Sequence, residues 1–215
     1  MSEHEPSPAD DLERTVRLAV ETLRDAPGTD AWESKAGSLD WTCWETAEHL
    51  SDDLFAYAVQ LGLTTPPLDV SVPFALESRR PGGPRNSVHA DREAGVTGLL
   101  QVLQTSGALL VAMVRTAPPD ARAHHVFGAA DPAASAAMGL VETLVHTYDM
   151  AQGLGLAWAP PADTCARVLA RLFPGAPRDT DPWTTLLWAT GRAELPGRPR
   201  LTTWRWHNEP VSQPS

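Results

Sequence analysis

The sequence predicts an all-α protein, a four-helix bundle followed by a small C-terminal appendage. Four long segments repeat apolar residues every three or four positions, which is the spacing of one face of an α-helix. The connections between them are uneven, and the longest, 64–90, is rich in Pro and Gly. Long helices joined by one or two long crossovers are typical of four-helix bundles. With 215 residues, 42% of them hydrophobic, the chain is large enough to bury such a core.

The first two predicted helices cover residues 8–26 and 44–61. Ser7 is placed to cap the first helix, and acidic residues fill its first turn. Both segments carry a regular apolar stripe, which we expect to face the core. The stripes consist of Leu12, Val16, Ala19 and Leu23 in the first helix, and of Trp44, Ala47, Leu50, Leu54, Ala58 and Leu61 in the second.

The third and fourth predicted helices cover residues 91–116 and 132–153. The third carries Leu99, Val102, Leu103, Leu110 and Met113. The fourth is apolar over most of its circumference, which predicts that it is buried, and it ends at a glycine, as helices often do. In the long connection before the third helix, residues 71–76 are predicted to form a short strand.

The sequence pattern changes after Gly155. Two shorter helices are predicted at 162–173 and 182–190, followed by an extended segment at 200–206. Five of the eight tryptophans lie in this tail, so it is too apolar to be disordered. We therefore expect a bundle domain at 1–155 and an appendage at 156–215 that packs on it.

The charge and the composition exclude several classes of function. The formal net charge is −10, so nucleic acid and anionic membrane surfaces would be repelled. The longest apolar run, 108–114, is far short of the roughly 20 residues needed to cross a bilayer. The basic residues are nearly all Arg, and together with abundant Ala, Pro and Gly this bias is associated with bacteria of high GC content.

The cysteines and the N-terminus indicate a cytoplasmic protein. Cys43 and Cys165 are too few for a disulfide framework or a cysteine-based zinc site. The first 13 residues are polar and acidic, unlike a signal peptide. We expect two reduced thiols in a cytosol.

A polar stripe on the fourth helix is the first candidate for chemistry. Glu142, His146 and Asp149 fall on one narrow face of a helix that is otherwise apolar. A buried charge without a partner is very costly, and a divalent metal would supply that partner. The alternative is that the stripe faces water. His49, on the second helix, lies with Asp53 away from the leucine stripe, and periodicity alone favours a solvated histidine there.

Two segments resemble a known family. The run LDWTCWETAEHLSDDL is similar to part of the DinB-like superfamily, and more closely to the N-terminal domain of the mycothiol-dependent maleylpyruvate isomerase family. In that family a Trp-Thr pair precedes a metal-binding histidine, as Trp41 and Thr42 precede His49. The run ETLVHTYDMAQGLG is similar to the family's fourth helix, and LLWATGRAELPG resembles its actinobacterial members.

The resemblance implies a DinB-like bundle whose metal ligands are His49, Glu142 and His146. Three ligands of the His₂Glu type leave a position open, as catalytic zinc requires; nickel and manganese are alternatives. The resemblance also implies mycothiol or a related low-molecular-weight thiol as cosubstrate or cofactor. Characterised relatives transfer such thiols or use them in isomerisation, and dimers are common among such bundles.

Other residues are candidates for supporting roles. Asp53 and Asp149 are placed either to orient the two imidazoles or to face water. Arg79, Arg80 and Arg205 could bind an anionic substrate through a bidentate contact.

The sequence leaves the function open between classes. The first hypothesis is a metal-dependent thiol S-transferase or thiol-assisted isomerase acting on a small electrophile. The second is a metal-dependent hydrolase, in which the metal activates water. Fe(II) oxygen chemistry also fits two histidines and one carboxylate, but it usually comes on a β-barrel. The last is a non-catalytic ligand-binding or dimerisation bundle with a vestigial metal site.

Overall fold

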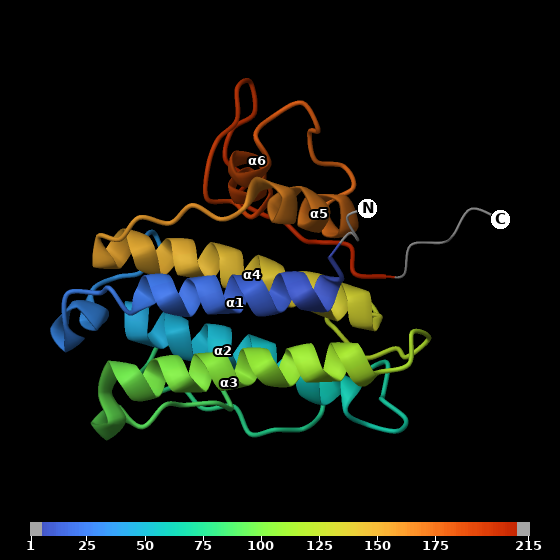
Figure 1. Ribbon diagram of the computed structural model, residues 1–215, viewed down its shortest axis with the longest axis horizontal. Coiled ribbons are helices and arrows are strands. Elements are labelled where there is room, and N and C mark those ends of the chain that lie inside the picture. Colours follow the sequence, from blue (N-terminus) through green and yellow to red (C-terminus); the bar gives the residue numbers. More distant parts are fainter. Residues whose placement is uncertain (1–5, 210–215) are drawn as a thin grey trace, which may run out of the picture.

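The protein is all-helical in the computed structural model, which describes residues 6–209. Four long helices lie side by side, and two shorter ones follow them (Figure 1). Two 3₁₀ turns complete the helical elements, and the described residues form no β-strand. The elements are α1 (Pro8–Leu23), η1 (Thr29–Glu33), α2 (Cys43–Leu61), η2 (Arg92–Ala94), α3 (Gly95–Thr116), α4 (Pro132–Leu154), α5 (Ala162–Leu172) and α6 (Pro182–Ala189).

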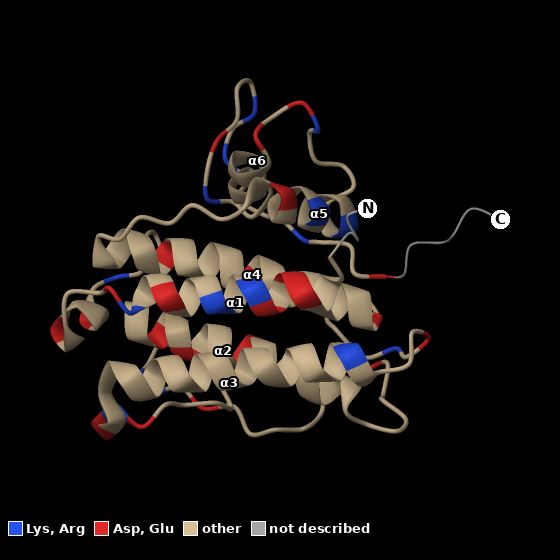
Figure 2. Cartoon of the chain, in the orientation of Figure 1, with Lys and Arg blue, Asp and Glu red and all other residues tan. Residues whose placement is uncertain are grey.

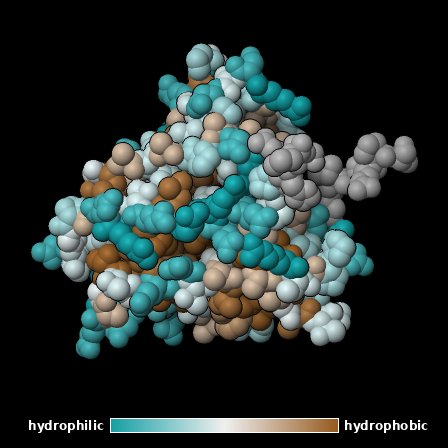
Figure 3. Space-filling model, viewed as in Figure 1, coloured by the Kyte–Doolittle hydropathy of each residue, from teal (hydrophilic) through white to brown (hydrophobic). Residues whose placement is uncertain are grey.

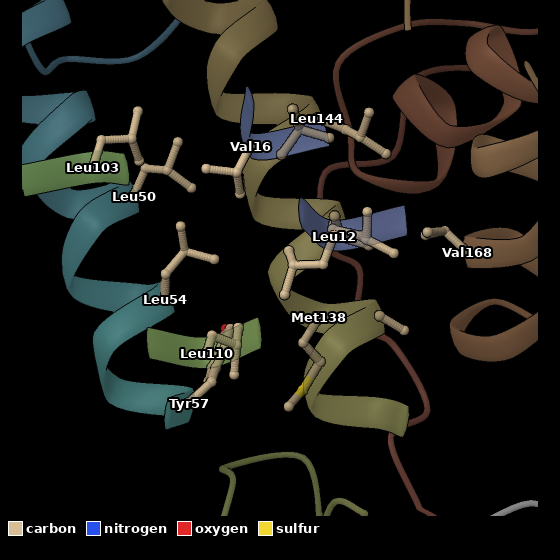
Figure 4. Close-up of a cluster of buried hydrophobic side chains, with 14 of the residues drawn as sticks. Leu12, Val16, Leu50, Leu54, Tyr57, Leu103, Leu110, Met138, Leu144 and Val168 are labelled. Carbon is tan, nitrogen blue, oxygen red and sulfur yellow. The ribbon is translucent and has the colours of Figure 1, made fainter. Parts of the chain in front are cut away.

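The core lies among the four long helices. Helices α1 and α2 each pack against both α3 and α4, so α2 and α4 share one seam and α1 and α3 share another. Apolar side chains from all four helices meet at the centre (Figure 4). Figure 4 labels Leu12 and Val16 of α1, Leu50 and Leu54 of α2, Leu103 and Leu110 of α3, and Met138 and Leu144 of α4.

Side-chain caps set the start of the helices that carry the candidate site. Thr42 caps α2: its hydroxyl accepts the Glu45 N–H, and the Glu45 carboxylate accepts the Thr42 N–H. The Asp131 carboxylate accepts the Ala134 N–H at the start of α4, and Gly155 ends that helix with φ of 69°. These boundaries fix which side chains of α2 and α4 face each other.

The predicted helices agree with the observed ones to within a few residues, but the predicted strand at 71–76 is wrong. That segment is irregular and mostly exposed, with the Phe74 N–H bonded to the Val72 carbonyl, and no strand among the described residues pairs with it. The nearby bridge between Glu77 and Asn86 is isolated. Alternating side chains cannot make a strand where no second strand is available for pairing. The segment 200–206 likewise forms no ladder with the described residues, and it bends at 202–203.

The tail packs back on the long helices, on the side of α1 and α4 (Figure 1). Arg167 of α5 forms an ion pair with the buried Asp11 of α1, at 2.6 Å between Nε and Oδ2. The His207 N–H donates to the Leu172 carbonyl, which holds the last segment against α5. The tail is therefore tied to the rest of the protein by specific contacts.

One helical stretch, Arg92–Thr116, has the length and hydropathy of a membrane span. Charged residues are confined to its ends (Figure 2). Leu99, Leu103 and Leu110 of this stretch are buried in the protein core. On the face shown in Figure 3, apolar patches alternate with polar side chains.

Candidate metal centre

Two pairs of polar side chains face each other across the seam between α2 and α4. Helix α2 contributes His49 and Asp53, and α4 contributes Glu142 and His146, each pair four residues apart and hence on one helical face. The rings of His49 and His146 are 5.5 Å apart between centroids. One ligand atom from each of His49, Asp53 and His146 lies within 4.8 Å of the others. The Glu142 Oε2 atom is 3.3 Å from His146 Nε2.

Both imidazoles are oriented by a contact at Nδ1. The Nδ1 atom of His49 lies 3.2 Å from the Asn86 side-chain oxygen, and that of His146 lies 3.2 Å from Asp149 Oδ2. A proton on Nδ1 satisfies both acceptors, so each ring can present Nε2 as a ligand atom when that nitrogen carries no proton. Metal-binding histidines are commonly fixed by such a contact at the second ring nitrogen.

The acidic residues of α4 are fixed by their own partners. The Tyr57 hydroxyl donates to Glu142 Oε1 at 3.2 Å. The Arg192 guanidinium donates to Asp149, with Nη2 2.6 Å and Nε 3.0 Å from its two oxygens. Asp149 is thus placed between Arg192 and His146, in the orienting position predicted for it. Arg192, which comes from the tail, was not among the predicted site residues.

The two histidines titrate in opposite directions. Burial, together with the nearby His146, lowers the pKa of His49 to about 4, so this ring is neutral at pH 7. Burial also disfavours the charged form of His146, but hydrogen bonds to Asp149 and Glu142 outweigh it and raise its pKa to about 9. In the absence of a metal, a proton on His146 supplies positive charge between the two carboxylates.

The pKa values of the two carboxyl groups in the seam, Asp53 and Glu142, also shift in opposite directions. Burial, with the neighbouring Glu142 charge, raises the pKa of Asp53 well above its ordinary value. Burial opposes ionisation of Glu142 too, but the hydrogen bond with His146 lowers its pKa. Oδ2 of Asp53 is buried and accepts no hydrogen bond from the described residues. A carboxylate oxygen without a hydrogen-bond donor, beside two imidazole rings, fits a divalent cation such as zinc, nickel or manganese.

A cavity of about 700 Å³ opens onto the site. His49, Glu142 and His146 line it on the side of the long helices, and the segments around 190–192 and 200–204 line it on the side of the tail. Trp41 and Trp204 supply aromatic surface, and the Trp41 ring contacts the His49 ring with 4.6 Å between centroids. The tail thus completes a pocket over the histidines, as a substrate site requires.

The arginines predicted to bind a substrate lie elsewhere. Arg79 forms an ion pair with the buried Glu48 at 2.9 Å, and Arg80 forms one with Glu45 at 2.7 Å. Arg205 stacks over the ring of Phe127. None of the three lines the cavity, because their guanidinium groups are engaged by these partners. Arg192 and Arg200 line it instead; the only sequence signal for them was their place in the Trp-rich tail.

The solvated position that periodicity favoured for His49 is also wrong. Its side chain is only 24% exposed, because the long connection supplies Asn86 and the preceding loop supplies Trp41 as neighbours. Asp53 lies close to both imidazoles, and one of its oxygens is 3.4 Å from His49 Nε2.

Comparison with known proteins identifies no relative of the chain. No family model, curated protein or solved structure matches the chain.

Proposed function

We propose that this protein is a metal-dependent enzyme that uses a low-molecular-weight thiol of the mycothiol type. Its substrate would be a small electrophile, to which it transfers the thiol or which it isomerises with the thiol's help. The fold would be a DinB-like four-helix bundle with the tail as an appendage. The observation that carries the proposal is the meeting of two imidazole rings and a carboxylate in the lining of an open cavity.

The residues that would hold the cation are His49, Glu142 and His146. Both histidines present Nε2, and Glu142 presents Oε2 while Tyr57 occupies its other oxygen. A divalent cation at this place would lower the pKa of a bound thiol and polarise a substrate carbonyl.

The remaining residues of the site have roles that follow from their contacts. Asp149, held by Arg192, keeps the His146 ring in one orientation and one tautomer. Trp41 and Trp204 offer apolar walls that exclude water from the reacting groups. Arg200 faces the same cavity and donates to the Ser38 hydroxyl, which leaves guanidinium surface for an anionic substrate group.

The size of the cavity agrees with two small reactants. Small-molecule sites commonly measure about 300–1,000 Å³, and about 700 Å³ accommodates a thiol together with an electrophile. The net charge of −10 argues against a polyanionic partner such as nucleic acid. A cytoplasmic enzyme acting on small molecules fits these features best.

The test is a thiol-consumption assay on protein loaded with zinc, nickel or manganese. Mycothiol or bacillithiol is mixed with a panel of enones and epoxides, and loss of free thiol is followed with and without prior chelation. We expect consumption that depends on metal and is abolished by His49→Ala and by His146→Ala. His124→Ala, in a loop that does not line the cavity, is the matched control and should retain full activity. Metal-dependent ester or amide cleavage without thiol would instead establish a hydrolase.

A further inference from the structure

We infer that Asp53 is a fourth protein ligand, so that the ion is held by two imidazoles and two carboxylates. The inference rests on the metal site proposed above and extends it by one residue. It concerns how many protein ligands the ion has, and therefore which metals could bind a substrate in addition.

The first support is position. Asp53 lies one helical turn after His49, and its Oδ2 atom is 3.4 Å from His49 Nε2. With His146 the three residues offer ligand atoms within 4.8 Å of one another. Donors that share one ion, each about 2.0–2.2 Å from it, are separated by up to roughly 4.4 Å. A small rotation of these side chains brings the three donors to that separation.

The second support is the lack of any other partner. Oδ2 of Asp53 is buried and accepts no hydrogen bond among residues 6–209. The adjacent Asp52 differs: its Oδ1 atom accepts the N–H groups of Ser87 and Val88, both at 2.8 Å. Buried carboxylate oxygens are normally partnered, so the exception at Asp53 points to a group that the polypeptide does not supply.

The third support is the balance of charge. Two carboxylates around a divalent cation give a neutral cluster, whereas one carboxylate leaves net positive charge in a buried seam. Arg192 is already committed to Asp149 and does not neutralise Asp53. Since burying net charge is costly, the second carboxylate favours binding of a divalent ion.

Four protein ligands change the choice of metal. A tetrahedral ion with four protein ligands is saturated, as in structural zinc sites. A substrate can then bind only to an ion that accepts five or six ligands. Nickel, iron and manganese do so readily, and a mixed imidazole and carboxylate set suits them. The active ion is therefore one of higher coordination number, in preference to four-coordinate zinc.

The test uses Co²⁺ as a spectroscopic probe of the ligand set. Full-length protein is freed of metal with a chelator and titrated with Co²⁺, with affinity measured against a competing indicator and coordination read from the visible absorption bands. Wild type, Asp53→Asn and Asp53→Glu are compared, with the exposed Asp69→Asn as control. Circular dichroism establishes that each variant is folded.

We expect Asp53→Asn to bind Co²⁺ at least about 100-fold more weakly than wild type, because loss of an outer partner alone costs about 10–100-fold. Its absorption bands should shift, and Asp53→Glu should regain part of the affinity. Equal affinity and identical spectra for wild type and Asp53→Asn would overturn the inference while leaving the metal site intact. Failure of the wild type to bind Co²⁺ would instead remove the site, and the inference with it.

Discussion

Helix α2 carries acidic residues on two adjacent faces, and the rest of the chain treats the two faces differently. On one face, Glu45, Glu48 and Asp52 are buried and each is partnered by the long connection: by Arg80, by Arg79 and by backbone N–H groups. On the other face, Oδ2 of Asp53 lies 3.4 Å from His49 Nε2 and accepts no hydrogen bond from the part of the chain that the structure describes. The same helix thus holds carboxylates that stabilise the fold and one that does not.

The difference separates carboxylates that stabilise the fold from one that we propose binds a metal. Arg79 and Arg80 hold the connection on α2 through these buried carboxylates, which gives them a role in the fold. A residue that the protein leaves unsatisfied in a buried site carries a cost in stability, and such residues are concentrated at functional sites. Substitutions on the two faces of α2 should therefore affect stability and metal binding differently.

The largest change in the free energy of unfolding is expected on the face of α2 whose carboxylates pair with the long connection. Glu48 accepts hydrogen bonds from Arg79, from the Trp44 indole and from the Ala90 N–H. Glu48→Ala removes a buried charged partner from all three and should lower the free energy of unfolding by about 3–5 kcal/mol. Urea denaturation measures this, with Glu21→Ala on exposed α1 surface as control. An effect no larger than that of the control would contradict the structural role.

The next effect concerns the metal-free site and its response to pH. The pKa of His146, about 9, lies above the ordinary 6.5, so the folded state binds the proton more tightly than the unfolded state. This contribution to stability is complete below pH 6.5 and is lost as the pH rises through 9. The loss is on the order of 3 kcal/mol. Urea unfolding of chelated protein across this range should show the loss in wild type but not in His146→Gln.

A smaller effect is expected from the partner of Glu142. Tyr57→Phe removes only the hydroxyl that donates to Oε1, so the carboxylate loses its fixed orientation. Metal affinity should fall about 10–100-fold, with little change in the fold. The other tyrosine, Tyr148, packs against Trp183 and donates no hydrogen bond among the described residues, which makes Tyr148→Phe the matched control. Equal affinities for the two variants would show that Tyr57 does not support the site.

The smallest change in stability is expected at Asp53, and in metal-free protein it is a gain and not a loss. Asp53→Asn replaces a half-buried carboxylate, whose Oδ2 accepts no hydrogen bond from the described residues, by a neutral group of the same size. In metal-free protein it should raise the free energy of unfolding by about 1 kcal/mol, since the cost of burying the charge disappears. In protein saturated with metal it should lower that free energy. A loss of stability in both states would mean that Asp53 has a partner of the structural kind.

Most of the helical fold could be predicted from the sequence. Every α-helix was expected within a few residues of its observed ends, since caps such as Ser7 and stops such as Gly155 act locally. The segment 71–76 was mispredicted because a strand depends on a partner that lies far away in the sequence. The path of the long connection, which brings Asn86 to His49, has no local signature either.

The candidate site could be predicted only in part. The apolar surroundings of Glu142 and His146 indicated that these charges need a partner, and the structure shows them facing His49. The sequence pattern of a polar helix face is the same whether water or another segment covers that face. Periodicity alone therefore predicted a solvated His49. Arg192 was missed because its role depends on the tail returning to α4, and nothing in its local sequence specifies that contact.

The central claim is that His49, Glu142 and His146 bind a divalent metal. Its most direct test is elemental analysis of protein purified without a histidine tag, compared with the His49→Ala, Glu142→Ala, His146→Ala triple variant. The account predicts near-stoichiometric zinc, nickel, iron or manganese in the wild type and background levels in the folded variant. A wild type that holds no metal even after incubation with each ion, or a variant that holds as much, would contradict it.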